Sequence, residues 1–274
     1  MQKSYPDVFF HVGLGKTGST YLQYRFFPKL KGISYIQRTR FWSYPKYSKR
    51  PASDKLLFSR EFDRQLERES KKFASYFPYA RPIIILRRHD GWIASQYRRY
   101  VKNGGHLSFG EFIDIQKNDG LWDKKVLSFF DKIRFLEDHF QHKPFILFQE
   151  ELKNDPFSFF DKMATFLGAD YSKKDVSLKP YHQSYSEKQL KYMRKWGRKI
   201  LPEKPSAGNS FIYWLTDKFR LHLCHLLLFA ARFGCGRKVE HEPLIESELL
   251  QIIRDAYDHD WQQCLDYAKK HNPV

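Results

Sequence analysis

The chain has 274 residues, 42% of them hydrophobic, which is enough for one sizeable α/β domain with its own core. Its 48 Lys and Arg residues outnumber its 31 Asp and Glu residues, and the net charge of +17 favours anionic partners. The 3 cysteines include no C-x-x-C pair, which excludes a disulfide framework and a zinc-finger-type site.

Several features predict a single domain over residues 1–274 in a reducing compartment. No repeat, low-complexity tract or Pro/Gly/Ser-rich linker divides the chain. The basic residues are spread among acidic ones, which argues against nucleic acid as the partner, since nucleic-acid-binding proteins concentrate them. The first predicted strand begins by about Asp7, leaving no room for a signal peptide or an N-terminal membrane anchor, so we expect a cytoplasmic protein.

Residues 9–21 predict a buried strand, a glycine-rich loop and the first turn of a helix. Glycines let backbone N–H groups crowd around an anion, and a helix N-terminus adds roughly half a positive charge. Lys16, Ser19 and Thr20 supply an ammonium group and two hydroxyls. The segment therefore predicts a phosphate-binding loop for a phosphorylated nucleotide.

This loop is not a Walker A motif, which needs Gly, four residues, and then Gly-Lys-Ser/Thr. Counting back five residues from Gly15 reaches Phe10, a bulky aromatic inside the predicted strand. The loop is thus too short to wrap a triphosphate, which disfavours an ATP or GTP site.

Strands alternate with helices over the next part of the chain. The pattern predicts helices at 20–29, 62–76 and 90–101, two more within 108–140, and strands at 33–36, 55–61, 82–87 and 144–148, with an irregular basic and aromatic segment at 38–54. Such alternation implies a parallel sheet covered on both faces, with ligands at the carboxyl ends of the strands. Lys16, Glu61, Arg87 and Glu150 stand at those ends.

The C-terminal part contains the most apolar long segment, at 210–233, which charged residues interrupt too often for a membrane span. We expect a buried helix; the alternative is a helix lying on a membrane, with Lys218, Arg232, Arg237 and Lys238 at anionic headgroups over 210–238. His222 and His225 are three residues apart, but no carboxylate or third histidine shares their face, so no metal site is predicted. A final amphipathic helix at 245–270 is expected to pack on the core.

The run Lys16-Thr17-Gly18-Ser19-Thr20 resembles the loop of PAPS-dependent sulfotransferases, in particular the bacterial carbohydrate type. In that family the loop, typically Pro-Lys-Ser/Thr-Gly-Thr/Ser-Thr, holds the 5′-phosphosulfate of 3′-phosphoadenosine 5′-phosphosulfate (PAPS). Here Gly15 replaces the proline. The resemblance implies a donor-binding loop made of Gly15, Lys16, Thr17, Gly18, Ser19 and Thr20.

Two further matches follow in the family's order. Arg87 at a strand end and Ser95 eight residues later resemble the family's pair that grips the 3′-phosphate, with Arg88 as the alternative if the strand register shifts by one. Residues 148–156 and 166–168 resemble its strand, Glu-Asp-Leu, Asp-Pro and Phe-Leu-Gly run. The matches cover about the first three fifths of the chain. Residues 181–198 do not match the family's Arg-Lys-Gly-x-x-Gly pattern, which leaves the adenine side open.

The resemblance also implies catalytic roles. Lys16 would neutralise the bridging oxygen of the leaving phosphate. Glu61 stands where the family has a His or Glu base, and a Glu favours a sugar or tyrosine hydroxyl as acceptor. The alternative for Glu61 is a residue at a helix N-terminus with Ser59 as the cap. His106 is a second candidate base, and His11, inside a strand, is expected to be a core residue.

The sequence thus predicts a three-layer P-loop-like α/β fold with a central parallel sheet flanked by helices, plus extra C-terminal helices. The predicted activity is sulfuryl transfer from PAPS, without a metal, to a hydroxyl of a carbohydrate or glycolipid, leaving adenosine 3′,5′-bisphosphate. Two alternatives remain open. One is a P-loop kinase or NTPase, which needs a strand-end Asp for Mg²⁺, and the other is a non-catalytic polyanion-binding protein.

Overall fold

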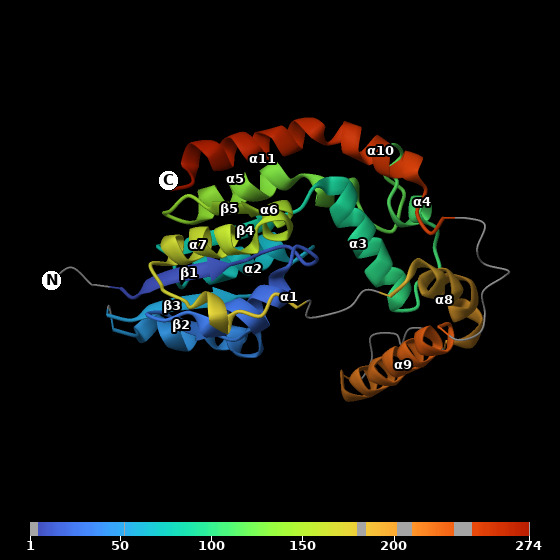
Figure 1. Cartoon of the computed structure of the whole chain (residues 1–274), viewed down its shortest axis with the longest axis horizontal. Helices are drawn as coiled ribbons and strands as arrows, with labels where there is room; N and C mark the ends of the chain where they lie inside the picture. The colour runs from blue at the N-terminus through green and yellow to red at the C-terminus, as the bar shows by residue number, and fades with distance from the viewer. Residues whose placement is uncertain (1–4, 52, 180–184, 202–209, 233–242, 274) are drawn as a thin grey trace. The chain divides into compact units, whose positions relative to one another are not determined.

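The computed structural model describes residues 5–51, 53–179, 185–201, 210–232 and 243–273. They form two compact units (Figure 1). The first comprises Met1–His89, Lys125–His182 and Ala256–Val274, and the second comprises Asp90–Lys124 and Gln183–Asp255.

The first unit is built on a five-stranded sheet in the order β2-β3-β1-β4-β5, and every neighbouring pair is parallel. The strands are β1 (Asp7–His11), β2 (Ser34–Ile36), β3 (Lys55–Ser59), β4 (Arg81–Leu86) and β5 (Phe145–Phe148). Each lies within two residues of its predicted position, and the predicted parallel sheet is confirmed. His11 pairs with both Ser59 and Ile83, and Leu86 pairs with Phe148, so the carboxyl ends of the four long strands lie along one edge.

Helices cover both faces of this sheet, as predicted for strands that are apolar on both sides (Figure 1). They are α1 (Ser19–Tyr21), α2 (Leu66–Ala74), α5 (Phe129–His139), α6 (Gln149–Asn154), α7 (Pro156–Leu167) and α11 (Asp258–His271). A π-helical stretch, Leu22–Phe26, and a 3-10 turn, Phe27–Lys29, continue α1. Further 3-10 helices are Arg38–Lys49, Lys124–Leu127 and Lys173–Asp175.

Alternate side chains of β1 enter two separate aromatic cores. Phe9 belongs to the cluster that α7 and the helical run after α1 close from one side. Phe10 points to the other face, where its ring stacks on Phe73 of α2 at 4.1 Å between centroids. The outermost strand, β5, is covered by a side chain: Asn272 accepts from the Ile146 N–H at 3.0 Å and donates to the Ile146 carbonyl at 2.7 Å.

The longer regular elements in the described part of the second unit are helices. Its helices are α3 (His89–Lys102, which starts in the first unit), α4 (Phe109–Phe112), α8 (Glu187–Ile200), α9 (Ser210–Ala230) and α10 (Ser247–Ala256). Helices α8 and α9 pack together, and Gln189 of α8 donates to the Leu228 carbonyl of α9 at 2.8 Å. Among the described residues, none of the helices combines the length and the apolar composition needed to cross a bilayer.

The structure corrects three predicted segments. The 108–140 segment holds one long helix, α5, because residues 109–112 form a single turn that the Ser108 and Glu111 capping box starts and an extended Ile113 ends. The predicted helix at 245–270 is two helices, α10 and α11, separated at Tyr257, whose backbone leaves the helical region. Residues 38–49 of the expected irregular segment form consecutive 3-10 turns.

The prediction that residues 210–233 form a buried helix is also wrong for α9. Five of its large apolar side chains are more than half exposed: Trp214, Leu215, Phe219, Leu226 and Phe229. Of the α9 side chains that the structure describes, only Cys224 and Leu228 are buried, so one half of this apolar helix lies outside any core. Arg237 and Lys238, predicted to meet headgroups, lie outside the described residues.

Candidate active site at the carboxyl edge of the sheet

The loop between β1 and α1 is a tight turn held by its own hydroxyls. The Thr17 hydroxyl donates to the Leu14 carbonyl at 2.6 Å, and the Ser19 hydroxyl donates to the same oxygen at 3.3 Å. Both side chains are buried. The two hydroxyls therefore shape the loop from inside, while Lys16, Gly18 and Thr20 remain partly exposed.

Two residues of the loop have left-handed backbones, Lys16 with φ 70° and Gly18 with φ 94°. Such a backbone is uncommon for a residue with a side chain, and the cost is typical of functional loops. Gly18 has a second constraint, because a Cβ there would lie 2.8 Å from Leu152 Cδ2 on α6. Leu152 thus closes over the loop, which gives the Glu-Glu-Leu run a structural role.

A buried polar cluster supports the loop from below. His11 Nδ1 lies 2.7 Å from Ser59 Oγ, and Gln23 donates to the same oxygen at 3.0 Å. Burial lowers the pKa of His11 to about 3, so its imidazole is neutral at physiological pH. A Cβ at Gly13 would lie 2.6 Å from His11 Nε2, so this ring packs directly against the loop backbone. The prediction that His11 is a core residue is confirmed.

Glu61 lies beside the loop, just beyond the end of β3. The Phe62 N–H donates to the Gly13 carbonyl at 3.2 Å, so the segments that follow β1 and β3 remain hydrogen-bonded beyond the ends of these strands. The Thr20 hydroxyl donates to Glu61 Oε1 at 3.0 Å. Helix α2 does not begin until Leu66, and Ser59 is a strand residue bonded to His11. The alternative that Glu61 starts a helix capped by Ser59 is therefore wrong.

Arg87 and Arg88 follow β4 and turn to different partners. Arg87 Nη1 donates to the Lys16 carbonyl at 3.5 Å, so this guanidinium faces the loop. Arg88 instead pairs with Asp258 of α11 at 2.6 Å, and its N–H donates to Glu150 Oε1 at 3.0 Å. Of the two arginines, only Arg87 is bonded to the loop in the described structure.

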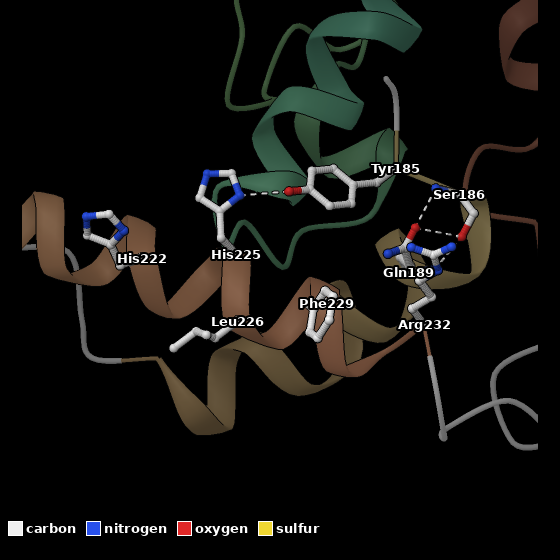
Figure 2. A pocket seen from close by; sticks show the side chains of 8 residues that line it. All are labelled: Tyr185, Ser186, Gln189, His222, His225, Leu226, Phe229 and Arg232. Carbon is white, nitrogen blue, oxygen red and sulfur yellow. Dashed lines mark hydrogen bonds between the residues drawn. The ribbon is translucent and has the colours of Figure 1, made fainter. Parts of the chain in front are cut away.

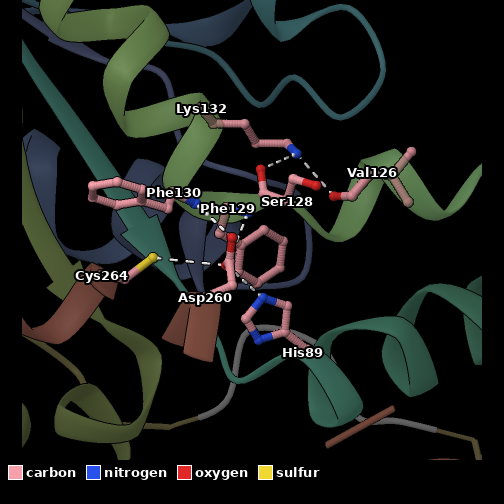
Figure 3. Close-up of polar contacts among 8 residues, drawn as sticks. All are labelled: His89, Val126, Ser128, Phe129, Phe130, Lys132, Asp260 and Cys264. Atoms are coloured by element: carbon pink, nitrogen blue, oxygen red, sulfur yellow. Dashed lines mark hydrogen bonds and ion pairs between the residues drawn. The ribbon is translucent and has the colours of Figure 1, made fainter. Parts of the chain in front are cut away.

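The chain after these arginines is anchored by α11 (Figure 3). His89 Nε2 lies 2.9 Å from Asp260 Oδ2, and the ring stacks on Phe129 at 4.1 Å between centroids. Asp260 also accepts the N–H groups of Phe129 at 3.1 Å and Phe130 at 3.2 Å, which caps α5. Burial lowers the pKa of the nearby Lys132 to about 8, and its ammonium group donates to the Val126 and Ser128 carbonyls. This network ties His89 to α5 and α11.

Asp63 is a site residue that the sequence analysis missed. Its Oδ1 accepts the Gly15 N–H at 2.9 Å, so a carboxylate from beyond β3 orients the first residue of the predicted donor loop. The only signal available from the sequence is its position two residues after Glu61.

Ser95 and His106 lie in the second unit, so their relation to the loop stays a prediction. Ser95 is half-buried on α3, and His106 is exposed, with its N–H donating to the Tyr100 hydroxyl at 3.3 Å. In the 181–198 segment, residues 181–184 and the Arg198 side chain lie outside the described part, while Arg194 donates to the Tyr97 hydroxyl at 3.4 Å. No group of His, Cys, Asp and Glu suited to a metal ion occurs among the described residues.

Comparison with known proteins gives structural likeness alone. No family model and no curated protein sequence matches the chain. A sulfotransferase from Alicyclobacillus acidocaldarius aligns with a TM-score of 0.49 and 18% identity, over 82% of this chain and 98% of that one. Mouse sulfotransferase SULT7A1 complexed with PAP aligns with a TM-score of 0.46 and 13% identity, over 97% of this chain and 86% of that one.

Proposed function

We propose that the chain is a sulfotransferase that moves the sulfuryl group of PAPS to a hydroxyl of a carbohydrate or glycolipid. The observation that carries the proposal is the convergence of three strand ends on one loop. Thr20 is bonded to Glu61 at 3.0 Å, and Arg87 is bonded to the Lys16 carbonyl at 3.5 Å. A carboxylate and a guanidinium thus contact a loop that contains a lysine and suits an anion.

The donor would lie with its 5′-phosphosulfate on the loop and its 3′-phosphate toward Arg87. An arginine offers two parallel N–H donors to a phosphate, and Ser95 would add a hydroxyl. The acceptor oxygen forms a bond to sulfur as the bond between sulfur and the bridging oxygen breaks, which releases adenosine 3′,5′-bisphosphate. Negative charge grows on that bridging oxygen, and the Lys16 ammonium would neutralise it.

Glu61 would take the proton that the acceptor hydroxyl loses. Its carboxylate is oriented by the Thr20 hydroxyl, and Thr20 itself belongs to the donor loop. A base tied to the donor loop is held in a fixed relation to the sulfur that is attacked.

The surroundings of Glu61 support a polar acceptor with an apolar face, such as a sugar ring. The Arg60 guanidinium lies over the Trp42 ring at 5.5 Å and donates to the Arg38 carbonyl at 3.2 Å. Trp42 is 53% exposed. An exposed indole with basic neighbours offers both a flat apolar surface and donors for hydroxyl or acidic groups.

The proposal is tested with sulfur-labelled PAPS and fractionated glycans and lipids. We expect a labelled product, and a loss of about 100-fold or more in kcat/KM for Lys16→Ala and for Glu61→Gln. Lys153→Ala, on the exposed surface of α6, is the matched control and should retain the rate.

Calorimetry separates the donor from its competitors. Adenosine 3′,5′-bisphosphate should bind more tightly than ATP·Mg²⁺, and Lys16→Ala should weaken that binding while Glu61→Gln leaves it unchanged. Tighter binding of ATP·Mg²⁺ would support a kinase instead. Absence of label transfer, with polyanion binding unaffected by Lys16→Ala, would support a non-catalytic binding protein.

A further inference from the structure

Helix α9 exposes an apolar face that is too large for a helix packed into a core. Trp214, Leu215, Phe219, Leu226 and Phe229 are between 53% and 64% exposed. At 100° per residue these five side chains share one half of the helix circumference. Cys224 and Leu228 are buried and lie outside this half of the helix, and Gln189 of α8 donates to the Leu228 carbonyl at 2.8 Å.

Two basic residues lie on the same side. Lys218 and Arg232 are exposed there, and Lys218 lies over the Trp214 ring at 6.0 Å from its centroid. The single acid of α9, Asp217, lies off this face and is less exposed. The neighbouring α8 carries six Lys and Arg residues against one acid, Glu187. This helical pair therefore suits an anionic surface.

A cavity of about 830 Å³ opens between this face and the start of α8 (Figure 2). His222, His225, Leu226, Phe229 and Arg232 line it from the α9 side, and Tyr185, Ser186 and Gln189 line it from the α8 side. The Tyr185 hydroxyl lies 2.7 Å from His225 Nδ1. Basic and hydroxyl groups thus stand directly beside apolar ones in one concave surface.

From this arrangement we infer that the exposed face of α9 binds the surface of an anionic lipid bilayer. The five apolar side chains enter the boundary between headgroups and acyl chains, with the helix axis in the membrane plane. Lys218 and Arg232 meet the headgroup phosphates, and the cavity accommodates a headgroup. Apolar area and cationic charge on one helix face are the two properties that such a surface recognises. The inference does not depend on the proposed sulfuryl transfer.

Sedimentation with vesicles tests it on the whole chain. Vesicles of phosphatidylcholine and phosphatidylglycerol should bind the protein, pure phosphatidylcholine should bind it much less, and added salt should weaken the binding. Phe219→Ser combined with Leu226→Ser should lower the affinity roughly tenfold or more, since two exposed apolar anchors are lost. Lys218→Gln and Arg232→Gln should each lower it about fivefold, and only with the anionic vesicles.

Matched controls come from exposed positions elsewhere. Ile252→Ser on α10 removes a comparable exposed apolar side chain, and Lys153→Gln on α6 removes one charge; both should bind as the unchanged protein does. Circular dichroism and thermal melting confirm that each variant is folded. Equal vesicle binding by the Phe219 and Leu226 double variant would overturn the inference. A second result would also overturn it: the unchanged protein binds no vesicles and is a dimer in sedimentation velocity, while the double variant is a monomer. In that case a second copy of the chain would cover the face.

Discussion

The buried imidazole beneath the loop makes the stability of the first unit sensitive to acid. The ordinary pKa of a histidine is 6.5, and burial lowers the pKa of His11 to about 3. The unfolded chain therefore binds a proton at mildly acidic pH that the folded chain does not bind. The free energy of unfolding should consequently fall as the pH falls below 6.5 and continue to fall until about pH 3.

The size of this effect follows from the shift. Each pH unit between the two pKa values costs about 1.4 kcal/mol, so lowering the pH from 7 to 5 should cost about 2 kcal/mol through His11 alone. Other groups titrate over the same range, so the useful quantity is the difference between the unchanged protein and His11→Asn. Asparagine can keep the hydrogen bond to Ser59 but carries no charge.

Urea unfolding followed by tryptophan fluorescence at pH 7 and pH 5 measures it. His11→Asn should be less stable than the unchanged protein at pH 7, and that deficit should shrink by about 2 kcal/mol at pH 5. A substitution of the exposed His106 by Asn serves as the control and should show no such convergence. If the deficit of His11→Asn is the same at both pH values, the imidazole is not held neutral by burial and the reasoning fails.

Three further predictions concern single contacts of the site. Gly18→Ala places a side chain on a left-handed backbone and against Leu152. The affinity for adenosine 3′,5′-bisphosphate, measured by calorimetry, should therefore fall about fivefold or more. An unchanged affinity would contradict the assignment of this loop to donor binding. Thr20→Val removes the hydroxyl that donates to Glu61 and belongs to the donor loop, so kcat should fall about tenfold and donor affinity should fall as well. Thr20→Ser should restore both, and an equal loss in the two variants would argue against a role for the hydroxyl. Asp260→Ala removes the cap of α5 and the partner of the buried His89 imidazole, so the free energy of unfolding in urea should fall by about 2 kcal/mol. The free energy should fall less for Asp260→Asn. An unchanged free energy of unfolding would mean that water replaces the carboxylate.

The parts of the fold that the sequence predicted well are those with local signals. The four buried strands are short apolar runs, and the loop after β1 combines glycines, a lysine and hydroxyls within eight positions. Glu61 and Arg87 were placed correctly at strand ends because parallel strands bring their carboxyl ends to one edge.

The contacts that the sequence analysis missed join residues far apart in the chain. Asp63 bonds to Gly15 across 48 positions, and Asp260 bonds to His89 across 171 positions. A periodic pattern in the sequence does not indicate such pairings, since they depend on how the helices and strands pack. The alternative that Ser59 caps a helix fails for the same reason: a serine before a charged helix looks like a cap, but its hydroxyl is hydrogen-bonded to His11.

The side chain of Asn272 on the outermost strand has a consequence for how the molecule avoids self-assembly. An unpaired strand edge offers its amide and carbonyl groups to any passing extended segment. Asn272 occupies both groups of Ile146, in the manner of a sixth strand one residue long. Asn272 lies directly after α11, 126 positions later in the chain, so this edge of β5 is covered only when the end of α11 is docked. Aggregation should therefore compete with the docking of α11 during refolding, and it should increase with protein concentration.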